Sequence, residues 1–483
     1  MIGAAVHAAP IFHLQHMRWI KISFPFLFLG LLAACSNTCD QKIVEVKLSN
    51  PGRNTLKVNA DVVLSEPLNA RIEYWVKGKE KEVFSTPVSR NKKNHHLMMT
   101  NLMPKQSYQY KVITEDGSCK AESKIYDFAT QNFPVWIHDL FKVTAPDQKV
   151  IPEVFKKGFM LIYQRELPGV IFLINARGEI KWYHQVTGTG FKTSHFSQNK
   201  TILSILGNEE YPTSYGNEIL EVSLNGDTLL HLKKGEKDFK QTIHHEILLN
   251  KKDQVVTLCV EQKIFDLSKY GGGKQDTVKS DGIMVLDRQG KKIWSWSVFD
   301  ELDPLKDKNV VRDKKDWMHA NSLNYDADGN YLISFYNNGQ VWKIDSKTGK
   351  VIWKFGKDGD FKMPAGSAFD QGHAVHMNSD GNLMLFDNGT SKKRSRTLIF
   401  KLDEQQKQAK LITETKLPSE IYNERMGSAY LVDRKAILQT TSKRHIVVLT
   451  NFTGTFLWML NTSIMPYRVE FIPEESLKPF LVN

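Results

Sequence analysis

Three histidines stand at matching places in a recurring sequence pattern. They are His245 in "HEILLN", His319 in "HANSLN" and His373 in "HAVHMN", and in each segment an apolar residue and then Asn follow four and five positions later. A neutral imidazole can act as a nucleophile, a protonated imidazole can donate a proton, and several imidazoles together can bind a metal ion. The residue types therefore predict chemistry or metal binding, provided that the fold brings the three side chains together.

The elements that would position these histidines belong to a repeat that begins near residue 150. A strand, a turn and a second strand recur six times, at a spacing of roughly 45 to 65 residues that suits a four-stranded propeller blade. The six units are "GVIFLINARGEIKWYHQ", "NEILEVSLNGDTLLHLKKG", "DGIMVLDRQGKKIWSWSV", "GQVWKIDSKTGKVIWKFG", "TLIFKLDEQQKQAKLITE" and "RHIVVLTNFTGTFLWMLN". They predict a six-bladed β-propeller, and we expect "PYRVEFI" near the C-terminus to complete a blade begun near residue 150.

Propeller geometry predicts where the three histidines lie. The innermost strands line the central channel, so equivalent positions on successive blades converge around the axis if the histidines open these strands. The structural alternative is a histidine satisfied at a turn or between blades, but such a residue should recur in most blades and the other units lack it. His244 and Asn321 add polar groups on the same strands, so we interpret the set as a functional cluster. Strand alternation predicts that His376 points away from the axis.

The residue types leave two chemistries open. A metal site is one, since imidazole is a common ligand, although no carboxylate or thiolate recurs beside the histidines and only Glu246 and Asp316 are near in sequence. The other is an anion site in which one imidazole is the nucleophile and cationic or N–H groups surround the transferred group. His245, His319 and Asn321 would supply those donors.

The N-terminus predicts export. "MRWIKISFPFLFLGLLAAC" begins at Met17 with basic residues, continues with an apolar run too short for a convincing membrane span, and ends in small residues before Cys35. The ending "LAAC" is similar to the bacterial lipobox, in which the cysteine is lipidated. We therefore expect residues 1–35 to be a signal peptide with Met17 as the true start, and Cys35 to anchor the protein to a membrane, most simply the outer one, in the periplasm or at the cell surface. An ordinary signal peptide cleaved nearby is the alternative.

Residues 36–135 predict a separate β-sandwich, and residues 136–483 the propeller. Short runs of alternating apolar and polar residues are separated by turn residues, and "LMPKQSYQYKV" resembles the fibronectin type III pattern. The fold class predicted for the chain is thus all-β, a propeller preceded by an immunoglobulin- or fibronectin-like sandwich. Cys39 and Cys119 could form a disulfide, which export permits, and Cys259 in "VVTLCVE" is expected to be a buried thiol.

The bulk composition fits a largely globular chain of 483 residues with a formal net charge of +12. Lys and Arg are scattered along the sequence and no nucleic-acid-binding motif is present, so we expect no nucleic-acid partner. Large aromatic residues recur at similar places in the repeats, and they predict packing between blades rather than a ligand site. They are Trp182, Trp294, Trp296, Trp342, Trp353 and Trp458.

Four segments carry a resemblance to a known family. In order along the propeller they are "IWSWSVFDELDP", "KKDWMHANSLNYDADGNYLIS", "QVWKIDSKTGKVIWKFG" and "FDQGHAVHMNSDGNLMLFDNGT". Together they look like the bacterial arylsulfate sulfotransferases, exported six-bladed propellers with a small N-terminal β-sandwich. The resemblance implies transfer of a sulfuryl group from a phenolic sulfate ester to a phenol, without a nucleotide donor (PAPS) or other cofactor and without a metal. It also implies a ping-pong mechanism through a sulfohistidine; a homodimer is left open.

By motif position the resemblance assigns the nucleophile to His373. Its supporting residues fall on His245, His319 and Asn321, with His244 as an alternative to His245. The expected chemistry agrees, because donors around the three sulfuryl oxygens stabilise the transition state, and His245 or His319 would protonate the departing phenolate.

Two positions depart from the family pattern. Tyr336 in "FYNNGQV" stands where the family usually has an arginine, and Gly372 intervenes where the family usually has Gln directly before the nucleophile. Arg425 in "NERMGSAY" or Arg468 in "PYRVEF" is a candidate to replace the missing guanidinium in the binding site. The substitution by Tyr336 favours the alternative function, a propeller that binds an anionic or sugar ligand in its funnel without chemistry or with altered specificity.

Overall fold

The structure, a computed structural model, describes residues 42–50, 54–117, 119–145, 148–211 and 213–482. Regular structure in these ranges is almost entirely β-sheet, which confirms the all-β prediction. The α-helices are short and lie at the edges of the sheets: α1 (Glu153–Lys157), α2 (Val310–Asp313) and α3 (Glu474–Leu477). The signal peptide, the lipobox and Cys35 lie outside the described residues, so these assignments stay predictions. In the described part of the chain, no helix is long and apolar enough to cross a membrane.

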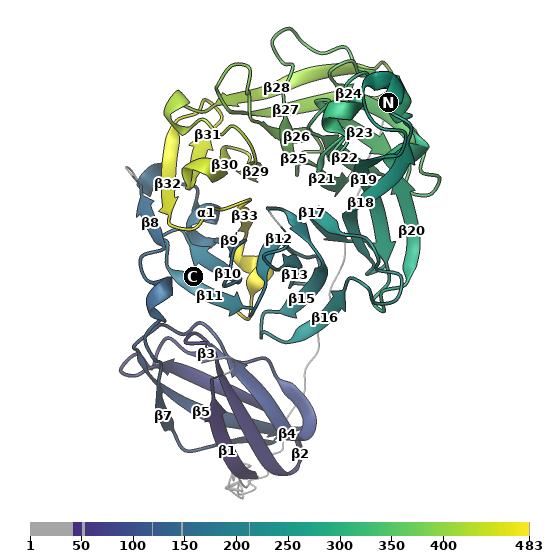
Figure 1. Cartoon of the computed structure of the whole chain (residues 1–483). Helices are drawn as coiled ribbons and strands as arrows, with labels where there is room; N and C mark the ends of the chain where they lie inside the picture. Colours follow the sequence, from purple (N-terminus) through teal and green to yellow (C-terminus); the bar gives the residue numbers. More distant parts are fainter. Residues whose placement is uncertain (1–41, 51–53, 118, 146–147, 212, 483) are drawn as a thin grey trace, which may run out of the picture.

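Six sheets surround a central axis, as Figure 1 shows, and confirm the six-bladed propeller. Blade one is β11 (Ile180–Gln185), β10 (Val170–Asn175), β9 (Phe159–Gln164) and β33 (Glu470–Ile472). Blade two is β16 (Thr228–Lys233), β15 (Glu218–Ser223), β13 (Thr201–Gly207) and β12 (Gly190–Phe196). Blade three is β20 (Lys292–Ser297), β19 (Asp276–Leu286), β18 (Val255–Phe265), β17 (Ile243–Leu249) and the two-residue β14 (Tyr215–Gly216).

The other three blades follow the same plan. Blade four is β24 (Val351–Gly356), β23 (Gln340–Ile344), β22 (Tyr331–Phe335) and β21 (Ala320–Tyr325). Blade five is β28 (Gln408–Lys416), β27 (Arg396–Asp403), β26 (Leu383–Asp387) and β25 (Gly372–Met377). Blade six is β8 (Phe141–Thr144), β32 (Phe456–Thr462), β31 (Ile446–Asn451), β30 (Ala436–Thr441) and β29 (Ser428–Asp433). The strands β33, β12, β17, β21, β25 and β29 lie nearest the axis (Figure 1).

The ring is closed by strands from both ends of the propeller sequence. The C-terminal strand β33 pairs with β9, and this confirms that "PYRVEFI" completes the blade begun near residue 150. The early strand β8 pairs with β32 at the outer edge of blade six. Each end of the propeller sequence therefore adds a strand to a blade built mainly from the other end, and these two pairings fasten the ring.

Buried aromatic residues join adjacent blades, as their recurrence predicted. The indole Nε1 of Trp458 in blade six donates to the Ala176 carbonyl of blade one at 2.7 Å, and the Nε1 of Trp182 in blade one donates to the Leu224 carbonyl of blade two at 2.8 Å. Both tryptophans are 1% exposed. These bonds satisfy the one polar atom of each indole while the ring fills the space between two sheets.

Within its described residues, the N-terminal unit has seven strands: β1 (Ile43–Ser49), β2 (Val58–Val76), β3 (Phe84–Ser85), β4 (Ser89–Met99), β5 (Ser107–Asp116), β6 (Cys119–Glu122) and β7 (Tyr126–Ala129). The first half of β2 pairs with β1 and β4, and its second half pairs with β3 and β5. The inward side chains of all these pairings form one apolar core. Its classification as an immunoglobulin- or fibronectin-like sandwich, and the boundaries of the two units, stay predictions.

The cysteines agree with the sequence expectations as far as the structure describes them. Cys259 is a buried free thiol on β18, as predicted. Cys119 is disulfide-bonded. Cys39 lies outside the described residues, so the pairing of Cys39 with Cys119 stays a prediction.

The N-terminal unit packs against blade one. The side-chain amide of Asn54 donates to the Tyr183 carbonyl at 2.7 Å, and the Tyr183 hydroxyl accepts from the Thr55 amide at 2.8 Å. The C-terminal end of the chain also returns to this unit, where Asn101 Nδ2 donates to the Phe480 carbonyl at 3.0 Å. The C-terminal segment is therefore held by the pairing of β33 with β9 and by the bond between Phe480 and the N-terminal unit.

We expect Trp458→Ala to destabilise the propeller by about 3–5 kcal/mol, because it opens a cavity at the seam between blades six and one. Trp458 also packs on Phe155 with the ring centroids 5.1 Å apart, so several contacts are lost together. Chemical denaturation followed by far-UV circular dichroism measures the change. Ile412→Ala on β28, where the side chain is 46% exposed, is the control and should shift stability by no more than about 0.5 kcal/mol. Equal midpoints for the two variants would contradict the role of Trp458.

Candidate functional site

The three histidines lie at one end of innermost strands in successive blades. His245 is on β17 of blade three, His319 directly precedes β21 of blade four, and His373 is the second residue of β25 in blade five. The ring centroids of His245 and His319 are 5.1 Å apart, and those of His319 and Tyr336 are 5.3 Å apart. The ring of Tyr336 is in turn 5.5 Å from that of His373. The fold therefore brings together the residues that the repeat singled out.

Unusual backbone conformations accompany this cluster. His245 and His319 adopt φ angles of 56° and 54°, and Ala374, next to His373, adopts 50°. In each of these innermost strands, the pairing with the neighbouring strand shifts register at or directly after the histidine. Left-handed conformations in residues other than glycine are costly and tend to persist where the surrounding structure holds a functional arrangement. A bulge also redirects a side chain that regular strand alternation would turn elsewhere.

His319 forms a dyad with Asp316. Its Nδ1 lies 2.5 Å from the Asp316 Oδ2. Burial by itself would lower the pKa of His319, but the hydrogen bond and the charge of Asp316 outweigh burial and raise it. Because Nδ1 is bonded to the carboxylate, Nε2 is the nitrogen that can exchange a proton with a ligand.

His373 is held in the opposite protonation state. It is 3% exposed, and burial together with the nearby charges of Arg468 and His319 lowers its pKa to about 3. Its Nδ1 is closed to solvent and makes no hydrogen bond of normal geometry with the described residues. The ring is therefore neutral near neutral pH, with Nε2 as the nitrogen open to a ligand.

His245 and His244 are also neutral. Burial and the charges of His319 and other neighbours hold the pKa of His245 well below its usual range, and burial lowers the pKa of His244 to about 4. The Nδ1 atoms of these two rings are 2.9 Å apart, so one donates to the other. On its far side, His244 Nε2 is 3.5 Å from the Asp281 carboxylate. His244 therefore lies behind His245 and orients it.

Asn321 is placed differently from its expected role as a donor to substrate. Its side-chain Nδ2 donates to the Gly372 carbonyl at 2.9 Å, and its Oδ1 accepts from the Ser334 hydroxyl. The amide is fully buried and holds the backbone directly before His373. A Cβ at Gly372 would meet only ordinary contacts with Phe369 and Leu385, so the fold does not require glycine there.

The three residues considered for anion binding take different positions. Tyr336 lies between the rings of His319 and His373. Arg425 is exposed to solvent near it. Burial raises the pKa of Tyr336, and the charge of Arg425 opposes this rise. Arg468 is 2% exposed and forms an ion pair with Glu246, while its Nη2 donates to the Asn321 carbonyl at 2.5 Å. Two terminal nitrogens of Arg468 are thus committed to protein groups.

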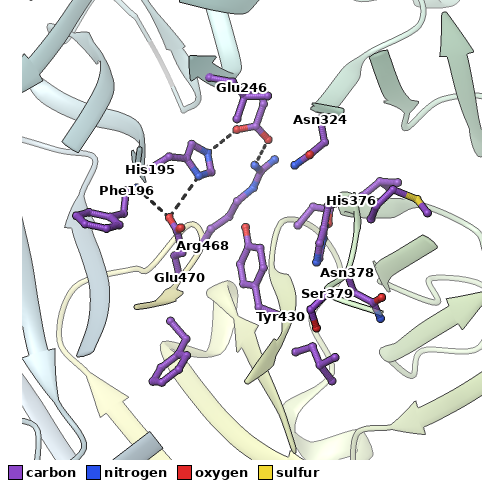
Figure 2. A pocket seen from close by; sticks show the side chains of 16 residues that line it. His195, Phe196, Glu246, Asn324, His376, Asn378, Ser379, Tyr430, Arg468 and Glu470 are labelled. Carbon is purple, nitrogen blue, oxygen red and sulfur yellow. Dashed lines mark hydrogen bonds and ion pairs between the residues drawn. The ribbon is translucent and has the colours of Figure 1, made fainter. Parts of the chain in front are cut away.

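A central cavity of about 300 Å³ lies further along the channel, on the other side of Arg468. Residues of all six innermost strands line it, and Figure 2 shows Arg468 reaching across it to Glu246. Glu246 also forms an ion pair with His195, whose Nδ1 is 3.5 Å from Glu470. His195 stands outside the repeated histidine position, and it follows three other polar residues on β12, so no sequence signal marked it as part of the channel.

His376 corrects one prediction. Strand alternation placed it away from the axis, but it lines the central cavity, as Figure 2 shows, with its ring 5.1 Å from that of Tyr430. The bulge between His373 and His376 is the reason, since one extra residue returns both side chains to the channel side of β25.

A second cavity, of about 340 Å³, adjoins the dyad from the side of blade three. Its walls include Tyr211, Tyr215 and Asp316. At its base lies Asp281, whose pKa is raised to about 7 by burial and by the charge of Asp316. Within the described residues, no group of three or more His, Cys, Asp or Glu side chains is arranged to hold a metal ion.

Comparison with known proteins identifies the family. Residues 144–448, more than half of the chain, match the family model described as "Arylsulfotransferase (ASST)", and the chain belongs to this family. Membership supports a sulfotransferase-type function at the level of the family, with aryl sulfates and phenols as the implied small-molecule substrates. No curated protein matches the chain.

Several solved structures are similar at low identity. A protein of unknown function from Bacteroides caccae is 10% identical with a TM-score of 0.42, and the match covers 65% of this chain and 99% of that one. The β-propeller domain of Cps50 (Swd1) from Myceliophteria thermophila is 12% identical with a TM-score of 0.39, covering 66% and 88%. Virginiamycin B lyase from Staphylococcus aureus is 10% identical with a TM-score of 0.36, covering 69% and 96%. At these values the likenesses carry no argument about function.

We expect the stability of the protein to fall as the pH rises from 6.5 to about 9, through the titration of His195. Burial alone would lower the pKa of this ring, but Glu246 and Glu470 raise it from 6.5 to about 9. Since the folded-state pKa is the higher one, the protonated ring stabilises the native state fully below pH 6.5 and loses this effect as the pH approaches 9.

Melting temperatures measured across this range test the expectation. His195→Gln should flatten the dependence on pH. His231→Gln, on the outer strand β16 and away from the channel, should keep the wild-type slope. A His195→Gln slope equal to that of wild type would show that another group is responsible.

Proposed function

We propose that the protein is an aryl-sulfate sulfotransferase that moves a sulfuryl group from a phenolic sulfate ester to a phenol through a sulfohistidine at His373, without PAPS. The observation that carries the proposal is the contrast between two neighbouring imidazoles. The pKa of His373 is lowered to about 3, which leaves its ring neutral, whereas Asp316 raises the pKa of His319. A nucleophile and a proton donor are thereby prepared in one funnel.

In the first half-reaction, Nε2 of His373 attacks the sulfur of the donor. The N–S bond forms as the bond between the sulfur and the phenolic oxygen breaks. His319 gives its Nε2 proton to this departing oxygen. The products are a free phenol and an N-sulfohistidine. Neutral His373 has a free lone pair for this attack at neutral pH. Without the proton from His319, the leaving group would depart as a phenolate.

The second half-reaction reverses these roles with a different phenol. The acceptor hydroxyl gives its proton to the now neutral His319, and its oxygen attacks the sulfur while the S–N bond breaks. His373 returns to the neutral state and the new sulfate ester leaves. His245 and His244 support the site through their mutual hydrogen bond, and Asn321 positions the His373 backbone.

The same proposal includes where the protein acts. We take the chain to be exported and held to a membrane by lipid on Cys35, with the N-terminal unit as an immunoglobulin- or fibronectin-like sandwich between the anchor and the propeller. The catalytic funnel would then face small aromatic compounds outside the cytoplasm.

A second candidate function is favoured by Tyr336. A tyrosine between His319 and His373 offers a ring and a hydroxyl but no charge, which suits a propeller that binds an anionic or sugar ligand without turnover. The two functions differ in one product, because only the enzyme forms a covalent adduct.

We expect His373→Asn to abolish transfer of sulfate from 4-nitrophenyl sulfate to phenol, by at least about a thousandfold, since the attacking nitrogen is lost. Intact-protein and peptide mass spectrometry after exposure to donor alone should show one SO₃ addition on the His373 peptide of the wild type and none on the variant. His138→Asn, an exposed histidine far from the channel, is the matched control and should transfer at the wild-type rate. Full turnover by His373→Asn would refute the assignment, and binding of donor without any adduct in the wild type would favour the second candidate.

We expect the rate of the donor half-reaction to fall as the pH rises through the raised pKa of His319, because the proton needed by the leaving phenolate is lost. Asp316→Asn removes the cause of the shift and should move this alkaline limb to lower pH. The loss in His319→Ala should be greater for phenyl sulfate than for 4-nitrophenyl sulfate, whose leaving group needs protonation less. Single-turnover rates measured with both donors test this, and equal losses for the two would rule out His319 as the acid.

A further inference from the structure

Arg165 is a buried cation at the site for which the fold provides no anion. It follows β9 in blade one and is 3% exposed. Its Nη1 approaches Ser214 Oγ at 3.5 Å and Met426 Sδ at 3.2 Å, both of them weak and uncharged partners. Its Nε is buried without a hydrogen bond, and no carboxylate of the described residues forms an ion pair with it. A buried guanidinium in this state is costly unless something else pairs with it.

The neighbours of Arg165 connect it to both sides of the histidine cluster. Its Cζ lies 5.1 Å from the centre of the Tyr467 ring, and that ring is 6.2 Å from the ring of His245. The carbonyl of Ser214 accepts from the His245 amide at 3.0 Å. Arg165 therefore contacts two residues that themselves contact His245.

On the other side, Arg165 reaches the surroundings of His373 through Met426. The Met426 carbonyl accepts from Asn388 Nδ2 at 2.9 Å. The side chain of Asn388 lies against the ring of His373 and opposes the fall in its pKa. The guanidinium thus contacts Tyr467, which lies against His245, and Met426, which bonds Asn388 beside His373.

Two further buried polar groups lie beside Arg165. Lys192, 5% exposed, donates from Nζ to the Arg165 carbonyl at 3.2 Å; burial and the charge of Arg165 lower its pKa, and the charge of Glu166 opposes this fall. The Tyr467 hydroxyl is buried without a hydrogen-bond partner in the described structure. Two cations and a free hydroxyl in one buried place form a built site for an anion.

The other guanidiniums near the cluster are less available. Arg468 is engaged with Glu246 and the Asn321 carbonyl, and Arg425 is exposed to solvent. His373 and His245 are neutral, and the charge of protonated His319 is balanced by Asp316, so the charge of a sulfate ester calls for a further cation in the funnel. Arg165 has unused donors in the fork geometry that suits two oxygens of one sulfo group.

We propose that Arg165, supported by Lys192 and the Tyr467 hydroxyl, binds the sulfo group of the aryl sulfate donor. The identity of the ligand rests on the proposed function, whereas the anion site itself rests on Arg165, which has no carboxylate partner among the described residues. Arg165 holds the sulfo oxygens while His373 faces the sulfur. Its charge is compensated only when the anion is bound, so the empty site carries a cost in stability that the ligand removes.

Binding of phenyl sulfate to the His373→Asn chain, which cannot turn over, tests this proposal directly by isothermal titration calorimetry. Adding Arg165→Met should weaken the affinity for phenyl sulfate at least tenfold and change the affinity for uncharged phenol less than twofold. Arg165→Lys keeps the charge but loses the planar pair of guanidinium donors. Its affinity for phenyl sulfate should therefore lie between those of the parent and of Arg165→Met. Arg177→Met, an exposed arginine of the same blade paired with Glu179, should leave both affinities unchanged.

Thermal melting separates this role from a structural one. An arginine that holds the fold together lowers the melting temperature when removed, whereas removal of an uncompensated buried charge leaves it unchanged or raises it. We expect Arg165→Met to melt no lower than its parent in buffer without anions, and to lose the upward shift that phenyl sulfate gives the parent. If the Met variant does not fold, the Arg165→Lys titration decides, and unchanged affinity there overturns the proposal.

The outcomes distinguish this inference from the proposed function. Arg165-dependent binding of phenyl sulfate without any sulfohistidine in the wild type would support the anion site and refute the enzyme. Sulfotransfer with an unchanged KM for the donor and unchanged affinity in Arg165→Met would support the enzyme and overturn the role of Arg165. Equal weakening of phenyl sulfate and phenol would also overturn it, because the effect would not depend on the charge of the ligand.

Discussion

The pairing of β33 with β9 is the constraint on which the rest of the molecule depends. It closes the ring, and only in a closed ring do six innermost strands surround one axis. The same short segment carries Tyr467, Arg468 and Glu470 into the channel. Closure of the fold and completion of the site therefore depend on the same segment, since Arg468, two residues before the strand that completes blade one, pairs with Glu246.

Electrostatics divides the channel into two parts with different roles. On one side of Arg468, the carboxylates of Glu246 and Glu470 surround His195 and raise its pKa to about 9. On the other side, burial and the charges of Arg468 and His319 lower the pKa of His373 to about 3. The same residue type thus becomes a stabilising cation in one place and a neutral base in another, because the protein surrounds it with different charges.

The sequence predicted the parts of this protein that repeat. The strand–turn–strand units, the recurring tryptophans and the terminal "PYRVEFI" sufficed for the propeller and its closure, because burial between sheets imposes the same alternation in each blade. The repeat also grouped His245, His319 and His373, and family membership of residues 144–448 agrees with the resemblance carried by these segments.

Parts of the site that do not repeat were not predictable in this way. His195 and Arg165 occupy positions without counterparts in the other blades. His376 was placed on the wrong face, because a bulge of one residue in β25 has no signature in an alternating pattern. Asn321 was expected to face a substrate, yet its amide bonds the Gly372 carbonyl of the adjacent blade, a contact between residues 51 positions apart.

The sequence by itself therefore determined which elements form, which strands face the axis and that His245, His319 and His373 gather there, since these follow from periodicity. Tertiary structure alone decided the protonation state of each histidine and the availability of each arginine. These properties depend on distances to charges from other blades and on exclusion of water, and neither is a property of any local segment. Arg468 and Arg165 are the same residue type, and only the fold gives Arg468 a carboxylate partner.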